Sequence, residues 1–403
     1  MVFLCKTIER NTLLSNIWRS ICYVDYNGIT KLISMKQIVF LYFLILPFGF
    51  VSGADFSKID VQSQSIPANL KTPEEIANYL TRNLTSPTEK TRAIFFWISH
   101  TIKYNNDLLN TGSNRFDRKE ILDEVLTTHK GVCQHFAELF HACCQSVGIQ
   151  SFVISGYTRQ GSALDPLSHA WNSVLIDSRY YEFDVTWAAS ALASSGGDNT
   201  IIDQYFMIPP SRFIKTHMPF DPIWQCLNNP LTNTEFVSCD YTKLRINSDY
   251  NYYDSISKLP TLSILDRMIR ENNRVVKCGL TNSLVQERAA LNLKNINLFK
   301  YNLAVENYNN SIAIYNSYLD AKFKNFYGGR LTKEQIYNMI LKSQKELEQA
   351  ETILNGIETD NNDTKLMIQN TQTSIFAQNK KLKKEDVFLD EYFKTWKPLR
   401  ILM

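Results

Sequence analysis

The chain has 403 residues, which is enough for two or three domains that each bury a core of their own. A hydrophobic content of 44% and a charged content of 21% are ordinary for a globular protein. The net charge is +3, from 43 basic and 40 acidic side chains, and no block of Lys and Arg stands out. Charge therefore gives no sign of an anionic membrane surface as a partner, and we expect no nucleic-acid partner.

The first distinctive segment is MKQIVFLYFLILPFGFVSGADF, which begins at Met35. A lysine, an apolar run and small residues before Asp55 follow the layout of a signal peptide, with Ser52 and Ala54 at the cleavage site. We therefore predict that residues 1–54 are an N-terminal extension and signal peptide, that translation starts at Met35, and that the mature chain is secreted or periplasmic. The alternative is a signal anchor; after cleavage we expect no stable membrane insertion.

Six cysteines follow the predicted cleavage site, at positions 133, 143, 144, 226, 239 and 278. An oxidising compartment permits disulfides, but six cysteines in roughly 350 residues do not form a disulfide scaffold. Cys143 and Cys144 lie in the middle of a predicted helix, where we expect them to be buried small hydrophobes. A bridge between Cys226 and Cys239 remains an open possibility.

Two helix starts carry the same signal. In KTPEEIANYL, Thr72 is the predicted N-cap and Glu75 completes a capping box, with proline at the first helical position. SPTEKTRAIFFWISHTIKY repeats the pattern with Ser86 and Glu89, and its apolar face includes Trp97. We expect helices from both segments.

A further helix begins at Cys133 and ends at Gly148, with its apolar residues on one stripe. IQSFVISGYTR then alternates with period two, as do HAWNSVLI and YYEFDVTW, which are separated by the turn DSR. These patterns predict an α+β layout, in which a helix presents Cys133 and two neighbouring antiparallel strands present His169 and Asp184.

A cysteine at the start of a helix suits nucleophilic chemistry. The thiolate is the nucleophile, and both the positive end of a helix dipole and a nearby imidazolium stabilise it. A distant histidine and a carboxylate complete the set needed for acyl transfer, namely the nucleophile Cys133, the base His169 and the orienting group Asp184. Periodicity alone leaves a structural cysteine as the alternative.

The segments GVCQHFAELFHACCQSVGI, GYT and HAWNSVLIDSRYYEFDVTW together resemble the core motif of the transglutaminase-like superfamily. DQYFMIPPSRFIKTHMPFDPIWQCL further resembles its kyphoscoliosis-peptidase-like branch, and the resemblance covers roughly residues 70 to 240. It implies a papain-like triad of Cys133, His169 and Asp184. It also implies a cleft walled by Trp97 or by the region of Trp187, and an oxyanion donor in the Cys133 N–H. A second oxyanion donor is not assigned.

Other candidates flank this triad. Trp171 shares a strand face with His169, and Gln134 follows the nucleophile, so with Trp97 and Trp187 they form the predicted substrate-binding set. His135 lies two positions after Cys133, and we expect it on the surface. The histidines at 100, 141 and 217 have no ligand spacing with a cysteine or a carboxylate. No calcium-type acidic loop is found either, and we expect neither metal nor cofactor.

From about residue 262 the sequence becomes rich in Asn, Lys and Leu. RLTKEQIYNMILKSQKELEQAETILNGI opens with a capping box and keeps one apolar stripe, and the segments around it are also helical in pattern. We predict a catalytic domain at 55–245, a linker at 246–261 and an all-α bundle of three or more helices at 262–403. The bundle is either a structural extension or a platform for a partner protein or substrate.

These features together predict an exported thiol enzyme that acts on protein or peptide substrates through a Cys133 thioester. Hydrolysis is favoured over crosslinking, because nothing in the sequence marks an amine-acceptor site and water is always present. The alternative is a non-catalytic scaffold that keeps the fold and binds peptides.

Overall fold

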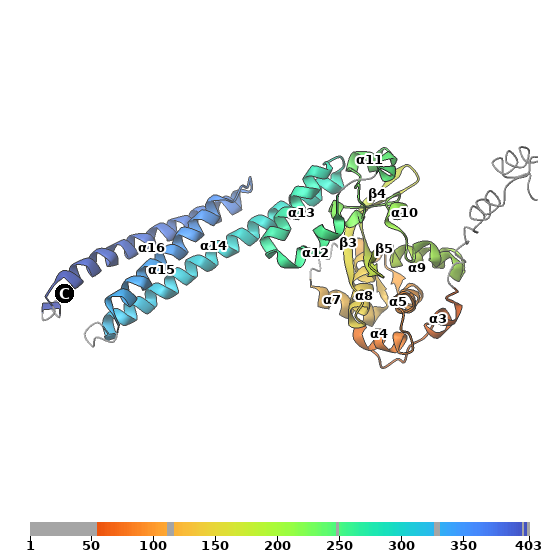
Figure 1. Ribbon diagram of the computed structural model, residues 1–403, viewed down its shortest axis with the longest axis horizontal. Coiled ribbons are helices and arrows are strands. Elements are labelled where there is room, and N and C mark those ends of the chain that lie inside the picture. Colours follow the sequence, from red (N-terminus) through yellow and green to blue (C-terminus); the bar gives the residue numbers. More distant parts are fainter. Residues whose placement is uncertain (1–54, 111–116, 247–249, 326–330, 397–398, 401–403) are drawn as a thin grey trace, which may run out of the picture. The chain divides into compact units, whose positions relative to one another are not determined.

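The computed structural model describes residues 55–110, 117–246, 250–325, 331–396 and 399–400 (Figure 1). The predicted signal peptide lies outside the described residues, so it stays a prediction. In the part that is described, no helix is both long enough and apolar enough to cross a membrane.

The described chain begins with three helices, α3 (Ser57–Gln62), α4 (Pro73–Thr81) and α5 (Pro87–Thr101). The capping box of α4 is confirmed: the Glu75 N–H donates to Thr72 Oγ1 over 3.2 Å, and the Thr72 N–H donates to Glu75 Oε2 over 3.1 Å. The matching prediction for α5 is wrong, since Ser86 makes no side-chain cap bond there. Its burial explains how α5 forms without a cap, because nine consecutive residues from Thr91 to Ser99 are buried.

A short parallel pair of strands fixes the entry to the next long helix. β1 (Lys103–Tyr104) pairs with β2 (Lys130–Gly131), and α6 (Asp107–Asn110) and α7 (Arg118–Thr128) lie between them in sequence. The Asn105 N–H donates to the Gly131 carbonyl over 2.9 Å. Helix α8 (Cys133–Ser146) starts two residues later, so its first turn is tied to the end of α5.

The sheet has four antiparallel strands in the order β5–β4–β3–β6. They are β3 (Ser151–Gln160), β4 (Ala163–Ile176), β5 (Arg179–Phe183) and β6 (His217–Pro219). The β4–β5 turn consists of Asp177 and Ser178, both with positive φ (48° and 61°), as in a two-residue type I′ hairpin.

Strand β5 is shorter than the alternating sequence pattern predicted. YYEFDVTW was expected to continue to Trp187, but β5 ends at Phe183 and α9 (Val185–Ser194) follows at once. The reason is Asp184, which is the N-cap of α9 and accepts the Trp187 N–H through Oδ1 at 2.9 Å. Asp184 therefore lies at a strand-to-helix junction and not inside a strand.

The two faces of the sheet are covered by different parts of the chain. Val174, Ile176 and Phe183 pack with α4, α5, α8 and α9 in the largest apolar cluster. The other face packs against α10 (Pro210–Phe213), η2 (Pro222–Gln225), α12 (Tyr252–Ser257) and η4 (Leu259–Thr261). The segment η1 (Asn199–Tyr205) adds Ile202 to the first cluster, and α11 (Asn233–Val237) and η3 (Thr242–Arg245) belong to a separate cluster around Tyr157.

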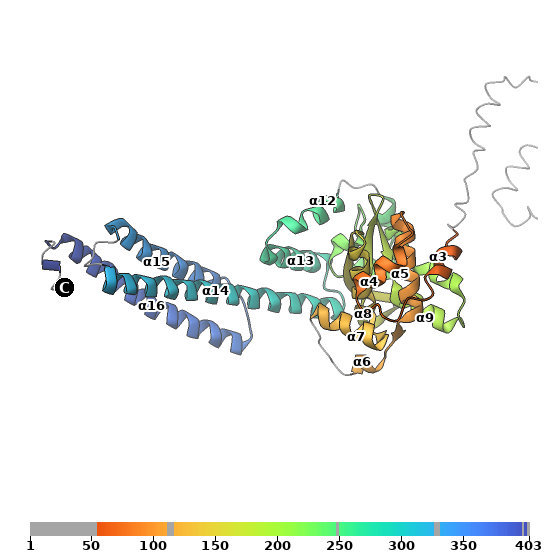
Figure 2. The same ribbon diagram turned by 90° about the horizontal axis from the view of Figure 1, so that it is seen from below.

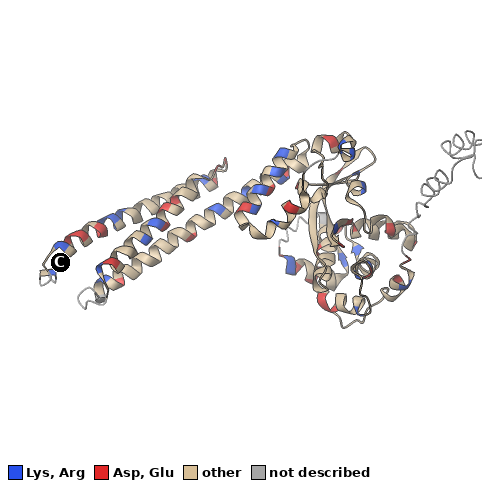
Figure 3. Ribbon diagram, viewed as in Figure 1, with Lys and Arg blue, Asp and Glu red and all other residues tan. Residues whose placement is uncertain are grey.

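Long helices make up the rest of the described chain: α13 (Ile264–Cys278), α14 (Ser283–Asn325), α15 (Lys333–Asn355) and α16 (Asn362–Lys394). Figure 2 shows α14, α15 and α16 alongside one another, and they share one buried apolar cluster. The predicted stripe of α15 is mostly buried, at Ile336, Ile340, Leu347, Ala350 and Leu354. Both basic and acidic residues occur along these helices (Figure 3). An α+β core with an antiparallel sheet followed by long C-terminal helices is thus confirmed.

The predicted linker contains ordered structure. Ile256 of α12 is buried with Tyr180 and Ile223 beneath the sheet. Further on, Arg274 of α13 forms a two-bond ion pair with Asp221, at 2.6 and 2.7 Å. The domain boundaries stay a prediction, but these contacts show that residues beyond 245 pack against the α+β core.

Candidate active site

Cys133 is the first residue of α8, and the loop before it is fixed by close packing. The Val132 N–H donates to His135 Nδ1 over 3.3 Å, and Nε2 of the same ring lies 3.3 Å from Glu124 Oε2. A Cβ on Gly131 would lie 2.4 Å from the His135 Cβ, so this approach requires glycine. The prediction that His135 is on the surface is wrong: α7 covers that side, and the ring is 7% exposed.

His169 of β4 and Asp184 lie in direct contact. His169 Nε2 is 2.9 Å from Asp184 Oδ2, and the exposed fractions of the two side chains are 10% and 0%. The Cys133 thiol lies close enough to the same imidazole to contribute to its raised pKa. Because Nε2 faces the carboxylate, Nδ1 is the ring nitrogen left for the thiol. The structure thus brings together the three residues that the sequence placed on separate segments.

A second imidazole, which the sequence pattern did not single out, shares the carboxylate. His217 Nε2 lies 3.0 Å from Asp184 Oδ2, and its Nδ1 lies 2.8 Å from the Thr216 hydroxyl. Its side chain is 1% exposed, and its ring stacks on Phe213 at 3.8 Å and contacts Trp187 at 4.4 Å. The sequence spacing of His217 gave no sign of this contact with a carboxylate. His217 is distant in sequence, and β6 brings it beside the site.

The two imidazoles differ in charge. Burial would lower the pKa of His169, but the Asp184 carboxylate and the Cys133 thiol outweigh it and raise that pKa to about 10. Burial lowers the pKa of His217 to about 4, against the pull of Asp184. Burial would raise the pKa of Asp184, yet the two imidazoles hold it well below its usual range. At neutral pH the network is an ionised carboxylate, a cationic His169 and a neutral His217.

Two histidines and an aspartate are also possible metal ligands, and among the described residues His169, Asp184 and His217 are close enough for this. Both Nε2 atoms, however, point at one oxygen, Oδ2, at 2.9 and 3.0 Å. That geometry is typical of two N–H donors on one anion, and a metal ion would need those nitrogens as free acceptors. The cluster is best interpreted as a proton network.

The predicted substrate-binding residues fall into two groups. Trp187 is half-buried, 5.9 Å from the His169 ring, and Gln134 is half-buried beside Cys133, where its amide donates to Glu138 over 3.0 Å. Trp97 and Trp171 are each only 2% exposed, so neither offers a face to a cleft.

The structure places those two tryptophans in packed surroundings, and their predicted role is wrong for that reason. Trp97 is part of the main apolar core. Trp171 stacks on His169 with ring centres 6.2 Å apart, and its indole N–H donates to the buried Glu182 over 3.2 Å. Trp171 therefore packs against the His169 ring and holds it in place. Burial raises the pKa of Glu182 to about 8, so this carboxyl group is protonated at neutral pH.

Tyr104 is a neighbour that sequence reasoning missed. Burial raises its pKa to about 12, with further contributions from the nearby Cys133 and Asp184, and its side chain remains 36% exposed. Tyr104 belongs to β1, just after α5, within the residues 70 to 240 that resemble the superfamily, but outside the motifs that carry this resemblance.

The cysteines other than Cys133 play no visible part in this site. Cys143 and Cys144 are buried as predicted. No bridge joins Cys226 to Cys239: both are free, the first buried with Sγ 3.7 Å from the Ser173 hydroxyl, and the second exposed.

Residues 74–185, which contain the Cys133, His169 and Asp184 cluster, match the family described as the transglutaminase-like superfamily. This match confirms the predicted resemblance to that superfamily for this part of the chain. It is similar to the kyphoscoliosis peptidase of Mus musculus, with 27% identity over 197 residues, which is 47% of this chain and 29% of that protein.

A second curated relative is cytokinesis protein 3 of Schizosaccharomyces pombe, with 29% identity over 185 residues, which is 43% of this chain and 20% of that protein. The chain spans less than a third of the length of the curated relatives it matches. One solved structure, described as that of a TGase, has 13% identity and a TM-score of 0.23, and covers 44% of this chain and 48% of that one.

Proposed function

We propose that the chain is an exported thiol-dependent hydrolase that cleaves amide bonds of protein or peptide substrates through a thioester on Cys133. The observation that supports this most is one imidazole that contacts a fully buried carboxylate and whose pKa is raised by that carboxylate and by the neighbouring thiol. The kinship with proteins named peptidase favours the same chemistry. Export is supported by the signal-like segment that begins at Met35.

The proposed reaction starts from the thiolate of Cys133 and the imidazolium of His169. The thiolate attacks the carbonyl carbon, and the main-chain N–H of Cys133, at the first position of α8, donates to the oxyanion. His169 gives its proton to the leaving amine, the C–N bond breaks, and a thioester remains. His169 then takes a proton from water, whose oxygen attacks the thioester and releases the acid and the thiolate. Asp184 holds the imidazole in position throughout.

Casein together with dansylcadaverine separates the possible outcomes. With the wild-type chain we expect new peptide N-termini to accumulate with time, and none with Cys133→Ala, because the thioester cannot form without the thiol. Mass spectrometry of the casein peptides reads both cleavage and amine incorporation. If dansylcadaverine becomes attached to glutamine side chains, the activity is crosslinking and not hydrolysis. If neither product forms with a panel of unfolded substrates, the result favours a non-catalytic scaffold.

His217 is proposed as a positioning residue that acts through Asp184. His217→Phe keeps a ring to stack on Phe213 but removes one of the two imidazole donors on Oδ2. We expect turnover to fall by about tenfold, the cost of one charge-assisted hydrogen bond. The pKa of His169 should rise further, because Asp184 Oδ2 would then accept a hydrogen bond from His169 only and would stabilise the imidazolium more strongly.

His217→Gln is the matched control, because its amide N–H can replace the Nε2 donor, and it should restore most of the loss. The pH profile of turnover distinguishes positioning from a structural defect: equal loss in both variants with an unshifted profile would rule the role out.

A further inference from the structure

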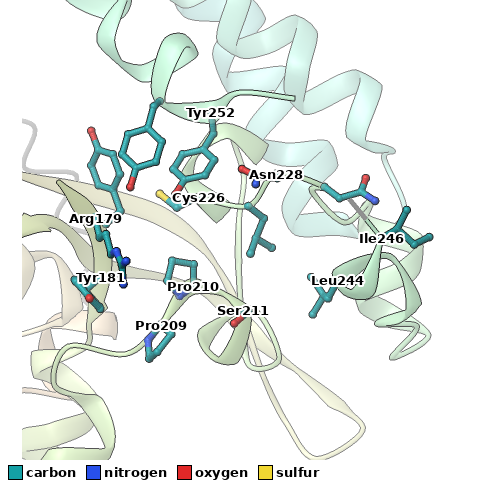
Figure 4. Close-up of a pocket in the computed structure, with 14 residues that line it drawn as sticks. Arg179, Tyr181, Pro209, Pro210, Ser211, Cys226, Asn228, Leu244, Ile246 and Tyr252 are labelled. Atoms are coloured by element: carbon teal, nitrogen blue, oxygen red, sulfur yellow. The ribbon is translucent and has the colours of Figure 1, made fainter. Parts of the chain in front are cut away.

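The outer edge of the sheet, at strand β5, borders a cavity of about 760 Å³. This volume is within the usual range for a binding pocket. Figure 4 shows Arg179 and Tyr181 on one side, Pro209 and Pro210 below, and Tyr252 and Leu244 across the opening. None of these residues belongs to the cluster around Cys133.

Among the residues that the structure describes, none pairs with the outward backbone of β5 at Tyr180, which lines the cavity and is 5% exposed. Glu182 pairs outward with Ile208 through two hydrogen bonds of 2.9 Å. In an antiparallel strand, residues two apart direct their backbone groups to the same side, so the N–H and C=O of Tyr180 also point outward. The β4 partner agrees: Leu175, opposite Tyr180, turns its N–H to Gln150 and away from β5.

Proline explains why the edge stays open. Continued from Glu182 and Ile208, the pairing would place Pro210 opposite Tyr180. Proline has no N–H to donate to the Tyr180 carbonyl, and the Pro210 carbonyl accepts the Ile214 N–H within α10. The segment therefore turns away from the strand after a single bridge, and the cavity lies where its next residues would have paired.

The side chains around this edge favour one kind of ligand. Arg179 is exposed and, among the described residues, forms no ion pair. Tyr181 and Tyr252 provide aromatic walls, and Ile246, with 58% of its surface exposed, adds an apolar rim. The guanidinium of Arg179 would pair with an acidic side chain on an added strand. The backbone of that strand would form hydrogen bonds with the N–H and C=O of Tyr180.

We propose that the β5 edge is a docking site for an extended, acidic segment of a partner protein, which adds as a strand at Tyr180 and pairs a carboxylate with Arg179. The segment's alternate side chains enter the cavity between Tyr181 and Tyr252. This binding needs neither the thiol nor the proposed amide chemistry, so it can hold or fail independently of the proposed function.

The test uses the full chain with Cys133→Ala, to exclude cleavage, and a fluorescein-labelled library of heptapeptides with a central glutamate. We expect polarisation to show binding that Arg179→Glu weakens by about tenfold, as reversal of one rim charge does. Arg212→Glu is the matched control: it is also exposed and makes the same change of charge, but Arg212 does not line the cavity. Ser211→Trp, which fills the cavity from an exposed position, should also weaken binding.

Hydrogen exchange supplies the structural readout. The Tyr180 amide should exchange faster than the Tyr181 amide in the free protein, and slow on addition of the library. No binding, equal binding of a library with central lysine, or binding unaffected by Arg179→Glu would overturn the proposal. So would a Tyr180 amide already protected in the free chain, which would mean that another segment of this chain occupies the edge.

Discussion

Replacement of His169 by alanine is expected to slow alkylation of Cys133 by iodoacetamide about 30-fold at pH 7. An ordinary thiol is only a few per cent thiolate at this pH, whereas one paired with a cationic imidazole at a helix N-terminus is largely ionised. His169 provides that cation, because its pKa is raised to about 10 and it keeps its proton across the neutral range. Turnover should fall further, by about 10⁴-fold, since the variant also lacks the general acid and base.

The dependence of the Cys133 alkylation rate on pH should also differ between the wild type and His169→Ala. In the wild type the rate of Cys133 alkylation should depend less steeply on pH than in the variant, because the His169 imidazolium persists until pH approaches 10. In His169→Ala it should rise about tenfold per pH unit below the ordinary thiol pKa of about 8.5. The exposed Cys239 is the internal control, and its rate should be the same in both proteins. Equal rates for Cys133 with and without His169 would remove the basis for the proposed chemistry.

Asp184→Asn is expected to reduce turnover by about 10³- to 10⁴-fold while the chain still folds. Asparagine fits the same space and can still accept the Trp187 N–H, but its amide group would meet the Nε2 atoms of His169 and His217 as a donor. The His169 tautomer with the proton on Nδ1 would then be favoured, and that nitrogen could no longer accept the thiol proton.

Stability should change in a defined pH window. The pKa of Asp184 is depressed, so its ionised form stabilises the fold above about pH 3.8 and this contribution is lost on acidification. The pKa of His169 is raised, so its contribution is complete below about pH 6.5 and is lost as pH rises toward 10. Asp184→Asn should cost about 2 kcal/mol at pH 7 and flatten both slopes in urea unfolding. Unchanged slopes would show that the carboxylate does not set these pKa values.

Much of this site could be predicted from the sequence, because its signals are local. The capping box at Thr72, the helix from Cys133 to Gly148 and the alternation of β3 and β4 each depend on a few neighbouring residues. The pairing of Cys133 with His169 needed the family's motif, since spacing alone does not bring a helix start to a strand.

The errors came from tertiary contacts that leave no local pattern. His135 is buried because α7 supplies Glu124 beside it, and His217 reaches Asp184 only because β6 pairs with β3. The alternation of YYEFDVTW continues through Asp184 and predicted a longer strand. An aspartate followed by a helical run is also a typical N-cap, and Asp184 takes this role at the start of α9. Trp97 resembled a cleft residue by motif, but its helix is buried on all sides.

The capping role of Asp184 has a consequence for how sequences of this kind are compared. The carboxylate satisfies a helix N-terminus and two buried imidazole N–H groups as well as orienting the base. A descendant that abandoned catalysis could exchange Cys133 at little structural cost, whereas loss of the aspartate would leave three buried donors without an acceptor. Retention of Asp184 in a related sequence is therefore explained by its structural role alone. Retention of Cys133 is the better sign that the proposed thiol chemistry is still under selection.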